Sequence, residues 1–506
     1  MLSIVCMFNN HPSKKVATPG YYSLKEYVSD IDEMQKSGPW RLPLRFIDRL
    51  QVLLLKCVLA FSWFADKLYI VHNDIAPPAY SILLKYLTKR ELFDTFSIRE
   101  SIIPGYYIYT LEKEHTHKNG YHISAQARGL DQDPTTALSK AIGELLERVI
   151  SGFLDTTKEV VRCSPRYFLE RGEAVYYPPL FHRFLPIQKK HAIDLFSDDS
   201  REIDWVRGIN IVTEQKTYVP KQVTSWGHLP THKEPVLICP TSNGCAGYFS
   251  PEGATVRALL EVINRDGFFV HWLTATPPEV VDTATLPDDL KHIVETLDMR
   301  GLSVYILNVT SLGVPSVYVV AINDKGDGDN IGILLSGSAD VSYHHAIKNA
   351  LEEVIGLTNL FNRPYTKSNK EYVPFISNLG QFDRFDYWRG KEKLELFSWF
   401  IEGDKVSYEK LEQKDLQMSN QDADRLDGVV SQLKQLGEEY YPVVYFPENQ
   451  MQQELQYWVA QVYIPKAFPL YLLERYGTFD SSRLLDFAHS CGKDSFNLNP
   501  MPHMFS

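Results

Sequence analysis

The sequence predicts a mixed α/β fold in which strands lead into helices. Runs rich in β-branched and aromatic residues, such as residues 304–309 and 315–322, indicate strands. Segments with helical periodicity lie between such runs, and one helical pattern occurs three times along the chain. Turn-rich segments lead into every copy of that pattern. Strands that alternate with helices in this way are typical of an α/β architecture.

The length and composition bound the number of domains and the kinds of partner. A chain of 506 residues predicts roughly two to three domains or one elaborated domain. Hydrophobic residues make up 44% of the chain, which is ample for a core. The net charge of −11 argues against general binding to nucleic acid or to anionic membranes. We therefore expect neither as a partner.

The first part of the chain predicts an N-terminal subdomain over residues 1–100, which we expect to dock a partner. Its most apolar segment, Leu50–Val71, is interrupted by Lys56 and Asp66, so it predicts a buried helix followed by a strand rather than a membrane span. No basic stretch precedes an apolar run at the start, so we expect no signal peptide. The six cysteines form no Cys-x-x-Cys pair, which is typical of reduced thiols in a cytoplasmic protein.

Three segments share one pattern of small and acidic residues. An alanine is followed four residues later by a second alanine, and three residues after that by Glu144, Glu261 or Glu353. A capping residue stands four positions before the first alanine in each copy: Asp133, Ser250 and Ser342. Proline follows the cap in the first two copies, which is a strong start signal for a helix. The pattern predicts three helices of one design, each with its glutamate about three turns from the start.

The shared phase of these glutamates indicates a function. Glutamate is a good helix former, and one such helix alone is better explained by an ordinary amphipathic face. Three copies in one register predict that the helices converge and pool their carboxylates. Pooled carboxylates need a cation, and Mg²⁺ prefers oxygen ligands together with substrate phosphates. Arg148 and Arg265 lie beside the acids and are placed to bind phosphate oxygens, to which a guanidinium donates two parallel hydrogen bonds.

These segments resemble the motifs of the YcaO family. The first is KAIGELLER at residues 140–148. The second is SNGCAG at residues 242–247, followed by Glu252 and by ALLEVINRD at residues 258–266. The third lies at residues 346–353. The motifs follow the family's order, and their combination is specific whereas each one alone is not.

The resemblance implies a YcaO-like fold over residues 101–485, with sheets covered by helices and three similar glutamate-bearing helices that converge on a nucleotide site. It implies binding of ATP and Mg²⁺ without a Walker loop, and no G-x(4)-G-K-[ST] occurs in the chain. The implied metal ligands are Glu144, Glu147, Glu261 and Glu353. The implied catalytic residues are Glu144, Glu147, Arg148 and Arg265, and the two arginines are implied to contact phosphate. The other residues implied to bind the cofactor are Arg128, Ser242, Asn243 and Glu252.

The activity implied by the resemblance is that of an ATP-dependent peptide cyclodehydratase. A Cys, Ser or Thr side chain of a ribosomally made precursor peptide adds to a backbone amide, the amide oxygen is phosphorylated, and a thiazoline or oxazoline ring remains. An amide oxygen is a poor leaving group until it is phosphorylated. Phosphoryl transfer depends mostly on positioning and charge neutralisation. Clustered acids holding Mg²⁺, with arginines on phosphate, supply both.

The C-terminal tail over residues 486–506 extends this resemblance. Azoline-forming members often end in a PxPxP-like sequence that reaches the active site, and this chain ends in NPMPHMFS, with Met504 at the position of the last proline. Prolines stiffen an extended segment, which suits insertion into a cleft. A terminus frays by default, but with the family motifs present we expect insertion, with Pro502 as a catalytic residue.

Three positions depart from the family pattern. Lys140 replaces the commoner Ser, Asn264 stands where Glu is frequent, and Gly356 stands where Gln is frequent. At Asn264 one metal ligand is expected to be weaker, neutral or absent. Two alternatives therefore stay open: a YcaO-type enzyme that forms thioamides or amidines, and a non-catalytic scaffold subunit that binds the peptide.

The resemblance also implies partner proteins. No zinc-type cysteine pairs and no Rossmann glycines occur in the chain, so the leader-binding protein that resembles ubiquitin-activating enzymes is expected to be a separate chain. A flavin-dependent azoline dehydrogenase is a further implied partner, and a homodimer within a complex is the expected assembly. Such complexes produce peptide natural products, antibiotics among them.

Overall fold

The computed structural model describes residues 93–504, with gaps at 102, 104, 117–121, 156, 192–199, 227–233, 239–240, 324–331, 363–371 and 378. The chain divides into two compact units, Met1–Val149 (unit 1) and Ile150–Ser506 (unit 2), and each is described by itself. Residues 1–92 of the expected N-terminal subdomain, with the apolar segment Leu50–Val71, lie outside the described residues.

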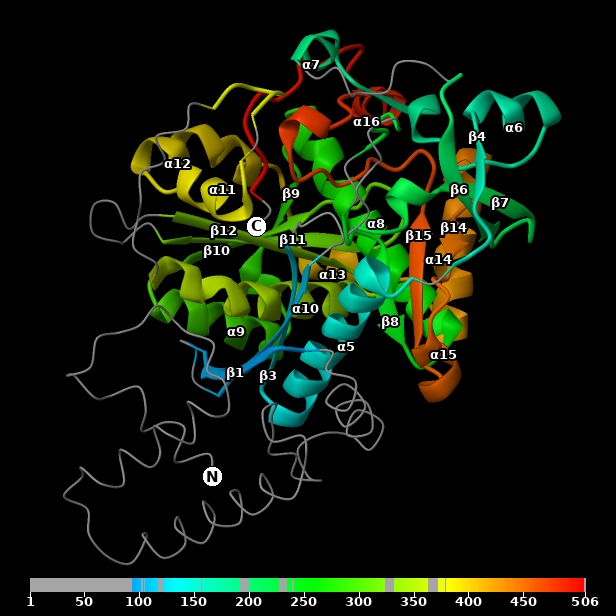
Figure 1. Cartoon of the computed structure of the whole chain (residues 1–506). Helices are drawn as coiled ribbons and strands as arrows, with labels where there is room; N and C mark the ends of the chain where they lie inside the picture. Colours follow the sequence, from blue (N-terminus) through cyan, green and yellow to red (C-terminus); the bar gives the residue numbers. More distant parts are fainter. Residues whose placement is uncertain are drawn as a thin grey trace, which may run out of the picture. The chain divides into compact units, whose positions relative to one another are not determined.

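Unit 1 contains an antiparallel sheet and all but the last four residues of a long helix (Figure 1). The strands β1 (Thr95–Glu100), β2 (Tyr107–Thr116) and β3 (His122–Asp131) pair in that order. Helix α5 (Pro134–Phe153) follows β3. Asp133 caps this helix, because its carboxylate accepts a hydrogen bond from the backbone N of Thr136 at 2.8 Å. The predicted start of the first repeated helix is therefore confirmed.

The backbone of β3 lies directly against α5. A Cβ atom on Gly129 would lie 1.8 Å from the carbonyl O of Ala137 and 2.5 Å from the backbone N of Ala141. Both alanines are fully buried. Small residues therefore permit a close approach of strand and helix, as the repeated alanines predict.

The first sheet of unit 2 has five strands in the order β12-β11-β10-β9-β13. Their bounds are β9 (Glu279–Val281), β10 (Ser303–Asn308), β11 (Ser316–Asn323), β12 (Gly332–Ala339) and β13 (Lys405–Val406). All pairs are antiparallel except β13 with β9. Helices α9 (Asp288–Met299) and α10 (Tyr343–Leu357) cover one face, and α11 (Gln381–Tyr387) and α12 (Lys391–Phe397) lie over the other (Figure 1).

The second sheet of unit 2 is antiparallel, in the order β4-β6-β14-β15-β8, and β7 pairs with β6 outside this path. Its strands are β4 (Val161–Cys163), β6 (Ile203–Asn210), β7 (Lys216–Pro220), β8 (Cys245–Tyr248), β14 (Val443–Tyr445) and β15 (Trp458–Tyr463). The two sheets of unit 2 and their covering helices confirm the predicted mixed α/β class.

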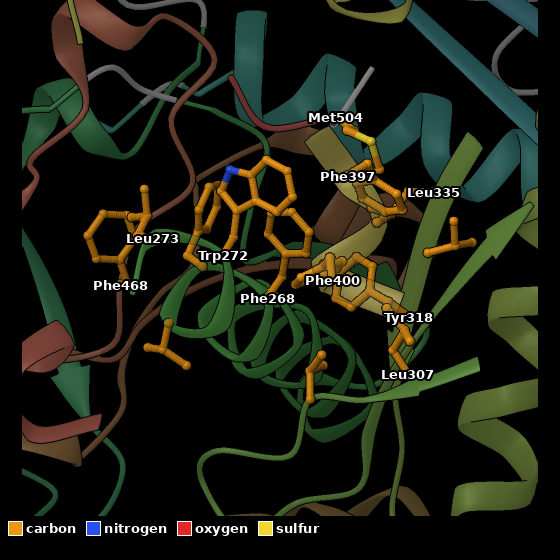
Figure 2. Packing of buried hydrophobic residues seen from close by; sticks show 14 of the residues in the cluster. Phe268, Trp272, Leu273, Leu307, Tyr318, Leu335, Phe397, Phe400, Phe468 and Met504 are labelled. Carbon is orange, nitrogen blue, oxygen red and sulfur yellow. The ribbon is translucent and has the colours of Figure 1, made fainter. Parts of the chain in front are cut away.

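Helix α8 (Pro251–Leu273) packs against both sheets, touching β8 and β15 of one and β11 and β12 of the other (Figure 1). Most of its residues are buried. Its C-terminal half supplies Phe268 and Trp272 to the main hydrophobic cluster, where they lie with Phe397, Phe400 and Tyr318 (Figure 2). A helix enclosed between two sheets is expected to bury most of its residues, and the polar ones among them need partners.

Smaller elements complete the described part of unit 2. The remaining helices are α6 (Pro165–Arg171), α7 (Pro186–His191), α13 (Tyr408–Glu412), α14 (Asp422–Leu436), α15 (Gln450–Leu455) and α16 (Ser482–Ser490). A two-stranded sheet joins β5 (His182–Arg183) to β16 (Asp480–Ser481). Among the described helices, none combines the length and the apolar character that a membrane crossing requires.

Some segments differ from the sequence expectation. Residues 335–339, expected in a turn-rich segment, belong to strand β12. Gly337 faces Tyr318 on β11, and a Cβ on Gly337 would lie 2.5 Å from the Tyr318 ring. The glycine therefore marks a strand position covered by an aromatic ring, which sequence alone reads as a turn. The apolar run at residues 236–238 has a composition typical of a strand but belongs to none of the named strands, and β8 precedes α8 instead. Short apolar runs are ambiguous in this way.

A buried ion pair fixes α8 to α16. Asp266 is fully buried, and Arg483 donates to both of its carboxylate oxygens, through Nε to Oδ1 at 3.0 Å and through Nη2 to Oδ2 at 2.6 Å. The backbone N of Phe468 and the hydroxyl of Ser311 donate to the same carboxylate, each at 2.8 Å. One side chain of α8 thus connects three other segments of unit 2.

Replacing Arg483 by Met is expected to lower the free energy of unfolding by about 3–5 kcal/mol, because the Asp266 carboxylate stays buried without its partner. Arg300, exposed at the end of α9, serves as the matched control, and Arg300→Met should cost less than about 0.5 kcal/mol. The double variant Asp266→Asn/Arg483→Met should recover part of the loss. Urea unfolding of all variants measures this, and equal costs for Arg483→Met and Arg300→Met would contradict the assignment.

Two buried histidines predict a stability that depends on pH. Burial lowers the pKa of His182 and of His271 to about 4, from an ordinary value of 6.5. Between these values the unfolded chain binds more protons than the folded chain, so stability is lost as the pH falls through this window. Each histidine should remove at most about 2 kcal/mol of stability between pH 7 and pH 5.

Urea unfolding at pH 7 and pH 5 tests this expectation. His271 Nδ1 lies 2.9 Å from the carbonyl O of Thr276, and the amide of Asn can replace that donor. The variant His271→Asn loses the ring contact with Phe487 and is therefore expected to be less stable at pH 7, but it should lose less stability between pH 7 and pH 5 than the wild type does. An identical pH dependence in both proteins would show that His271 does not titrate as its burial requires.

Candidate functional site

Both carboxylate oxygens of Glu144 are engaged within unit 1. Oε2 accepts a hydrogen bond from the backbone N of Arg128 on β3 at 2.6 Å, and Oε1 lies 2.5 Å from Nη2 of Arg148, one turn later on α5. Arg148 also donates through Nη1 to the carbonyl of Gln126. The side chains of Glu144 and Arg148 are 30% and 34% exposed, so a solvent-borne ligand can reach both.

Helix α8 repeats this arrangement within unit 2. Oε2 of Glu261 accepts a hydrogen bond from the backbone N of Gly244 at 2.9 Å, and Oε1 lies 3.6 Å from Nη2 of Arg265. Gly244 has a φ of 76°, and a Cβ there would lie 2.5 Å from the carbonyl O of Val462. The turn therefore requires glycine. Ser250 caps α8 by accepting from the backbone N of Gly253 at 3.0 Å, as predicted.

The third glutamate follows the same rule with a different donor. Glu353 on α10 accepts a hydrogen bond from the hydroxyl of Ser336 on β12, and Ser342 caps the helix. In all three copies the donor stands 16 or 17 residues before the glutamate. Each glutamate thus fastens its helix to the strand or turn that precedes it, which is a structural reason for the shared phase.

Two neutral side chains hold the guanidinium of Arg265. Its Nη1 donates to the hydroxyl O of Tyr318 on β11 at 2.9 Å and to Oδ1 of Asn264 at 3.1 Å. Asn264 is buried, and its Nδ2 donates to the hydroxyl O of Ser316 at 2.9 Å and to the carbonyl O of Val317 at 3.2 Å. The side chain of Asn264 therefore points into the sheet, and its Oδ1 accepts a hydrogen bond from the neighbouring Arg265.

The electrostatics of this cluster keep Arg265 charged. Burial opposes the charge, but Tyr318, Glu261 and Glu353 together raise the pKa of its guanidinium. Burial also raises the pKa of Tyr318, so the hydroxyl stays protonated at neutral pH. Glu261 and Glu353 both act on Arg265, which brings two of the predicted acids into one electrostatic group within unit 2.

The turn before α8 borders a small cavity. Asn243 donates its backbone N–H to Oγ1 of Thr241 at 3.2 Å, while its Oδ1 is buried and accepts no hydrogen bond from the described residues. The cavity has a volume of about 40 Å³ and is lined by Thr241, Asn243 and mostly apolar side chains of β15 and the segment after it. This space holds about one water molecule or a small group of a ligand.

The other predicted site residues occupy varied surroundings. Glu147 on α5 and Ser242 in the turn are partly buried, and Arg128 is exposed. Glu252 is exposed in the first turn of α8. It stands nine residues before Glu261, so the helix separates the two by about 13 Å. Glu252 therefore lies apart from the cluster around Arg265.

The acidic residues do not form a ready-made metal cage. Within the described ranges, no three His, Cys, Asp or Glu side chains are grouped as metal ligands. Glu144 and Glu147 belong to unit 1, and Glu261 and Glu353 belong to unit 2. The chemistry of the donor set nevertheless fits Mg²⁺ with a nucleotide, because partly exposed carboxylates bind the cation and neighbouring arginines bind phosphate.

The C-terminal tail is packed into unit 2. The carbonyl groups of residues 500–503 each accept a hydrogen bond from a side chain, at distances between 2.8 and 3.3 Å; the donors are Tyr372, Trp272, Trp388 and Arg384. His503 is fully buried, with Nε2 2.7 Å from the carbonyl O of Tyr471. Met504 lies beside Phe397 in the main hydrophobic cluster (Figure 2). The described part of the tail is therefore not frayed.

Arg384 connects the tail to the interior through a buried ion pair. Its Nη1 donates to the carbonyl O of His503 at 3.2 Å, and its Nη2 donates to the carbonyl O of Leu472 at 2.6 Å. Nη1 also lies 2.7 Å from Oε1 of Glu474, and both side chains are almost fully buried. Arg384 therefore holds the tail and neutralises a buried acid at once.

Sequence reasoning missed three residues of the Arg265 cluster. Tyr318 lies in an ordinary apolar strand, and Ser336 lies in a segment that reads as a turn. For Asn264 the sequence predicts only a metal ligand that is weaker, neutral or absent. Nothing near Tyr318 in the sequence reveals its role, because its partners come from α8 and β12. The available signal for Asn264 was its place directly before Arg265.

Comparison with known proteins identifies the motifs. A family model described as "YcaO cyclodehydratase, ATP-ad Mg2+-binding" matches residues 128–467. The predicted cofactors, ATP and Mg²⁺, are thereby confirmed at the level of the family. The comparison with curated proteins finds no match.

Solved structures share the fold at low sequence identity. A heterocyclase in complex with substrate and cofactor superposes with a TM-score of 0.65 at 17% identity, covering 84% of this chain and 57% of its own. This chain thus spans little more than half the length of that protein. YcaO from Methanopyrus kandleri, bound with AMPPCP and Mg²⁺, gives a TM-score of 0.55 at 16% identity over 79% of this chain and 94% of its own.

A third structure is the E. coli microcin synthetase McbBCD complex with pro-MccB17 bound, in which the matched chain has a TM-score of 0.50 at 13% identity and covers 81% of this chain and 96% of its own. These similarities confirm the predicted YcaO-like fold.

Replacing Arg384 by Met is expected to loosen the tail, because the His503 carbonyl loses its donor and Glu474 loses its counter-charge. Hydrogen exchange of the backbone amides of Asn499, Met501, His503 and Met504 should accelerate at least tenfold, the equivalent of about 1.4 kcal/mol in local opening. Arg171, exposed on α6, supplies the control Arg171→Met, which should leave the tail unchanged. Equal exchange in Arg384→Met and wild type would contradict the role of Arg384.

Proposed function

The chain belongs to the YcaO family, and we propose that it is an ATP-dependent cyclodehydratase that acts on backbone amides of a ribosomally made precursor peptide. The observation that carries the proposal is the repeated pairing of a partly exposed glutamate with an arginine one turn later, in Glu144–Arg148 and Glu261–Arg265. Each pair combines a ligand for Mg²⁺ with a partner for phosphate. The family description, which names ATP and Mg²⁺, supports this reading.

The proposal assigns a role to each predicted residue. In this proposal the metal ligands are Glu144, Glu147, Glu261 and Glu353. The phosphate groups are contacted by Arg148 and Arg265. Ser242 and Asn243 border the nucleotide, and the buried Oδ1 of Asn243 is an acceptor that a ligand can use. Arg128 is exposed beside Glu144 and can reach a nucleotide. Glu252 has the weakest support, because α8 holds it two and a half turns from Glu261.

The proposed chemistry follows from the poor leaving-group character of an amide oxygen. ATP with Mg²⁺ supplies a phosphoryl group that converts the amide oxygen into a leaving group after a Cys, Ser or Thr side chain has added to the amide carbon. The residues of the chain contribute position and charge: guanidinium groups fix phosphate oxygens, and carboxylates hold the cation. Loss of phosphate then leaves a thiazoline or oxazoline ring.

The packed tail supports a role of the C-terminus in this reaction. The Pro502 carbonyl is bound by Trp388, and Met504 lies in the same hydrophobic cluster as Tyr318. Tyr318 in turn binds Arg265. We therefore assign Pro502 to the segment that shapes the catalytic site.

The proposal extends to partners. A neighbour in fold is part of the McbBCD complex with pro-MccB17 bound, and by analogy the chain works beside a separate leader-binding protein that resembles ubiquitin-activating enzymes. A flavin-dependent azoline dehydrogenase is the further partner we propose, with the chain as a homodimer inside a cytoplasmic complex that makes a peptide natural product.

One observation favours a second candidate, a non-catalytic peptide-binding subunit. Asn264 is buried and turned into the sheet, so it does not replace the acid that is frequent at this position of the motif. The retained pairs Glu144–Arg148 and Glu261–Arg265 favour the enzyme.

Calorimetric titration with ATP, in the presence and absence of Mg²⁺, tests the proposal. We expect the wild type to bind ATP only with Mg²⁺, and both Glu144→Gln and Glu261→Gln to weaken binding by roughly tenfold or more, because each removes a carboxylate charge from the cation. Glu114→Gln and Glu295→Gln change exposed acids of the two units and should bind as the wild type does.

The outcomes separate the candidates. Unchanged ATP affinity in both Glu144→Gln and Glu261→Gln would contradict the assignment of these residues to the site. No binding by the wild type would contradict an autonomous enzyme and favour the peptide-binding subunit. Melting temperatures control for the hydrogen bonds that Glu144 and Glu261 make to the backbone.

A further inference from the structure

We propose that Asn264 and Tyr318 are positioning residues that hold the guanidinium of Arg265 for the phosphate groups of a nucleoside polyphosphate. The inference rests on the proposed ATP site and adds two residues to it. Both bind the same nitrogen, Nη1, at 3.1 and 2.9 Å. The other terminal nitrogen, Nη2, faces Oε1 of Glu261 at 3.6 Å, which places that edge of the guanidinium beside a proposed metal ligand.

Both anchors are electrically neutral. An amide oxygen and a phenol oxygen fix the direction of the guanidinium without adding a further counter-charge to the one that Glu261 supplies. Asn264 therefore contributes a fixed acceptor for Arg265 at a position where the family motif frequently carries an acid.

The anchors are themselves rigid. Tyr318 packs its ring against Phe268 of α8, with centroids 5.0 Å apart, and covers Gly337 on the neighbouring strand. The amide of Asn264 has only one orientation that satisfies its surroundings, because Nδ2 donates to Ser316 and Val317 while Oδ1 accepts from Arg265. Flexible arginine side chains lose conformational entropy when they bind, so anchoring Arg265 beforehand favours phosphate binding.

The decisive experiment is a double-mutant cycle on the full-length chain. ATP affinity with Mg²⁺ is measured for wild type, Tyr318→Phe, Arg265→Gln and the double variant. We expect Tyr318→Phe to weaken ATP binding by roughly five- to tenfold, as for one lost hydrogen bond to a charged group. In the Arg265→Gln background the same change should have no further effect, because Tyr318 acts through Arg265.

Two further variants separate positioning from a general loss of structure. Tyr343→Phe removes the hydroxyl of another fully buried tyrosine, which bonds Thr310 and Asn308, and should leave ATP affinity unchanged. Asn264→Ala removes the acceptor that Arg265 uses, and should weaken binding of ATP and of inorganic pyrophosphate while leaving adenosine unaffected.

The outcomes distinguish this inference from the proposed function. If the wild type binds ATP and Tyr318→Phe and Asn264→Ala bind it equally well, the positioning role is wrong and the ATP site stands. If Tyr318→Phe weakens binding equally with and without Arg265, its role is only structural. If the wild type binds neither ATP nor pyrophosphate, the proposed function and this inference are both overturned.

Discussion

The buried ion pair between Asp266 and Arg483 is the interaction on which the centre of unit 2 depends. Helix α8 packs against two sheets, so nearly every face of it is buried and a charge on it has to be neutralised from within. Arg483 does this from α16, and the backbone of Phe468 and the hydroxyl of Ser311 complete the set of donors. The pair is costly to bury but strongly directional, so it fixes how α8 is rotated between the sheets. That rotation also sets where Glu261 and Arg265 point.

The structural role of the repeated glutamates is compatible with the role that we propose for them. Each one fastens its helix to the preceding strand or turn, which makes the local unit of strand and helix rigid. The remaining carboxylate oxygen of Glu144 and of Glu261 faces an arginine one turn later. In the proposed function, a glutamate that is held by the backbone through one oxygen would offer the cation a fixed position for the other. The structural explanation of the repeat therefore does not exclude the proposed functional one.

Glycines permit close packing of β3 against α5 and of a β11 side chain against β12. Gly129 lets β3 touch the backbone of α5, and Gly337 leaves room for the Tyr318 ring over β12. The second contact matters for the site because Tyr318 then presents its hydroxyl to Arg265. The tail joins the same hydrophobic cluster through Met504, so the end of the chain and the Arg265 cluster share one core.

The sequence by itself determined the class of fold, the three capped helices, the phase of their glutamates and the family, because caps, helical periodicity and motif spacing are local properties of the chain. It also indicated the two glutamate–arginine pairs, since residues four apart meet on one face of a helix. Only the tertiary structure decided that Asn264 turns into a sheet, that Tyr318 and Ser336 belong to the cluster, and that glycine-rich segments read as turns are partly strand. These features depend on contacts between residues far apart in the chain, such as Tyr318 with Arg265 and Gly337, and no local pattern encodes which distant side chain fills a given space.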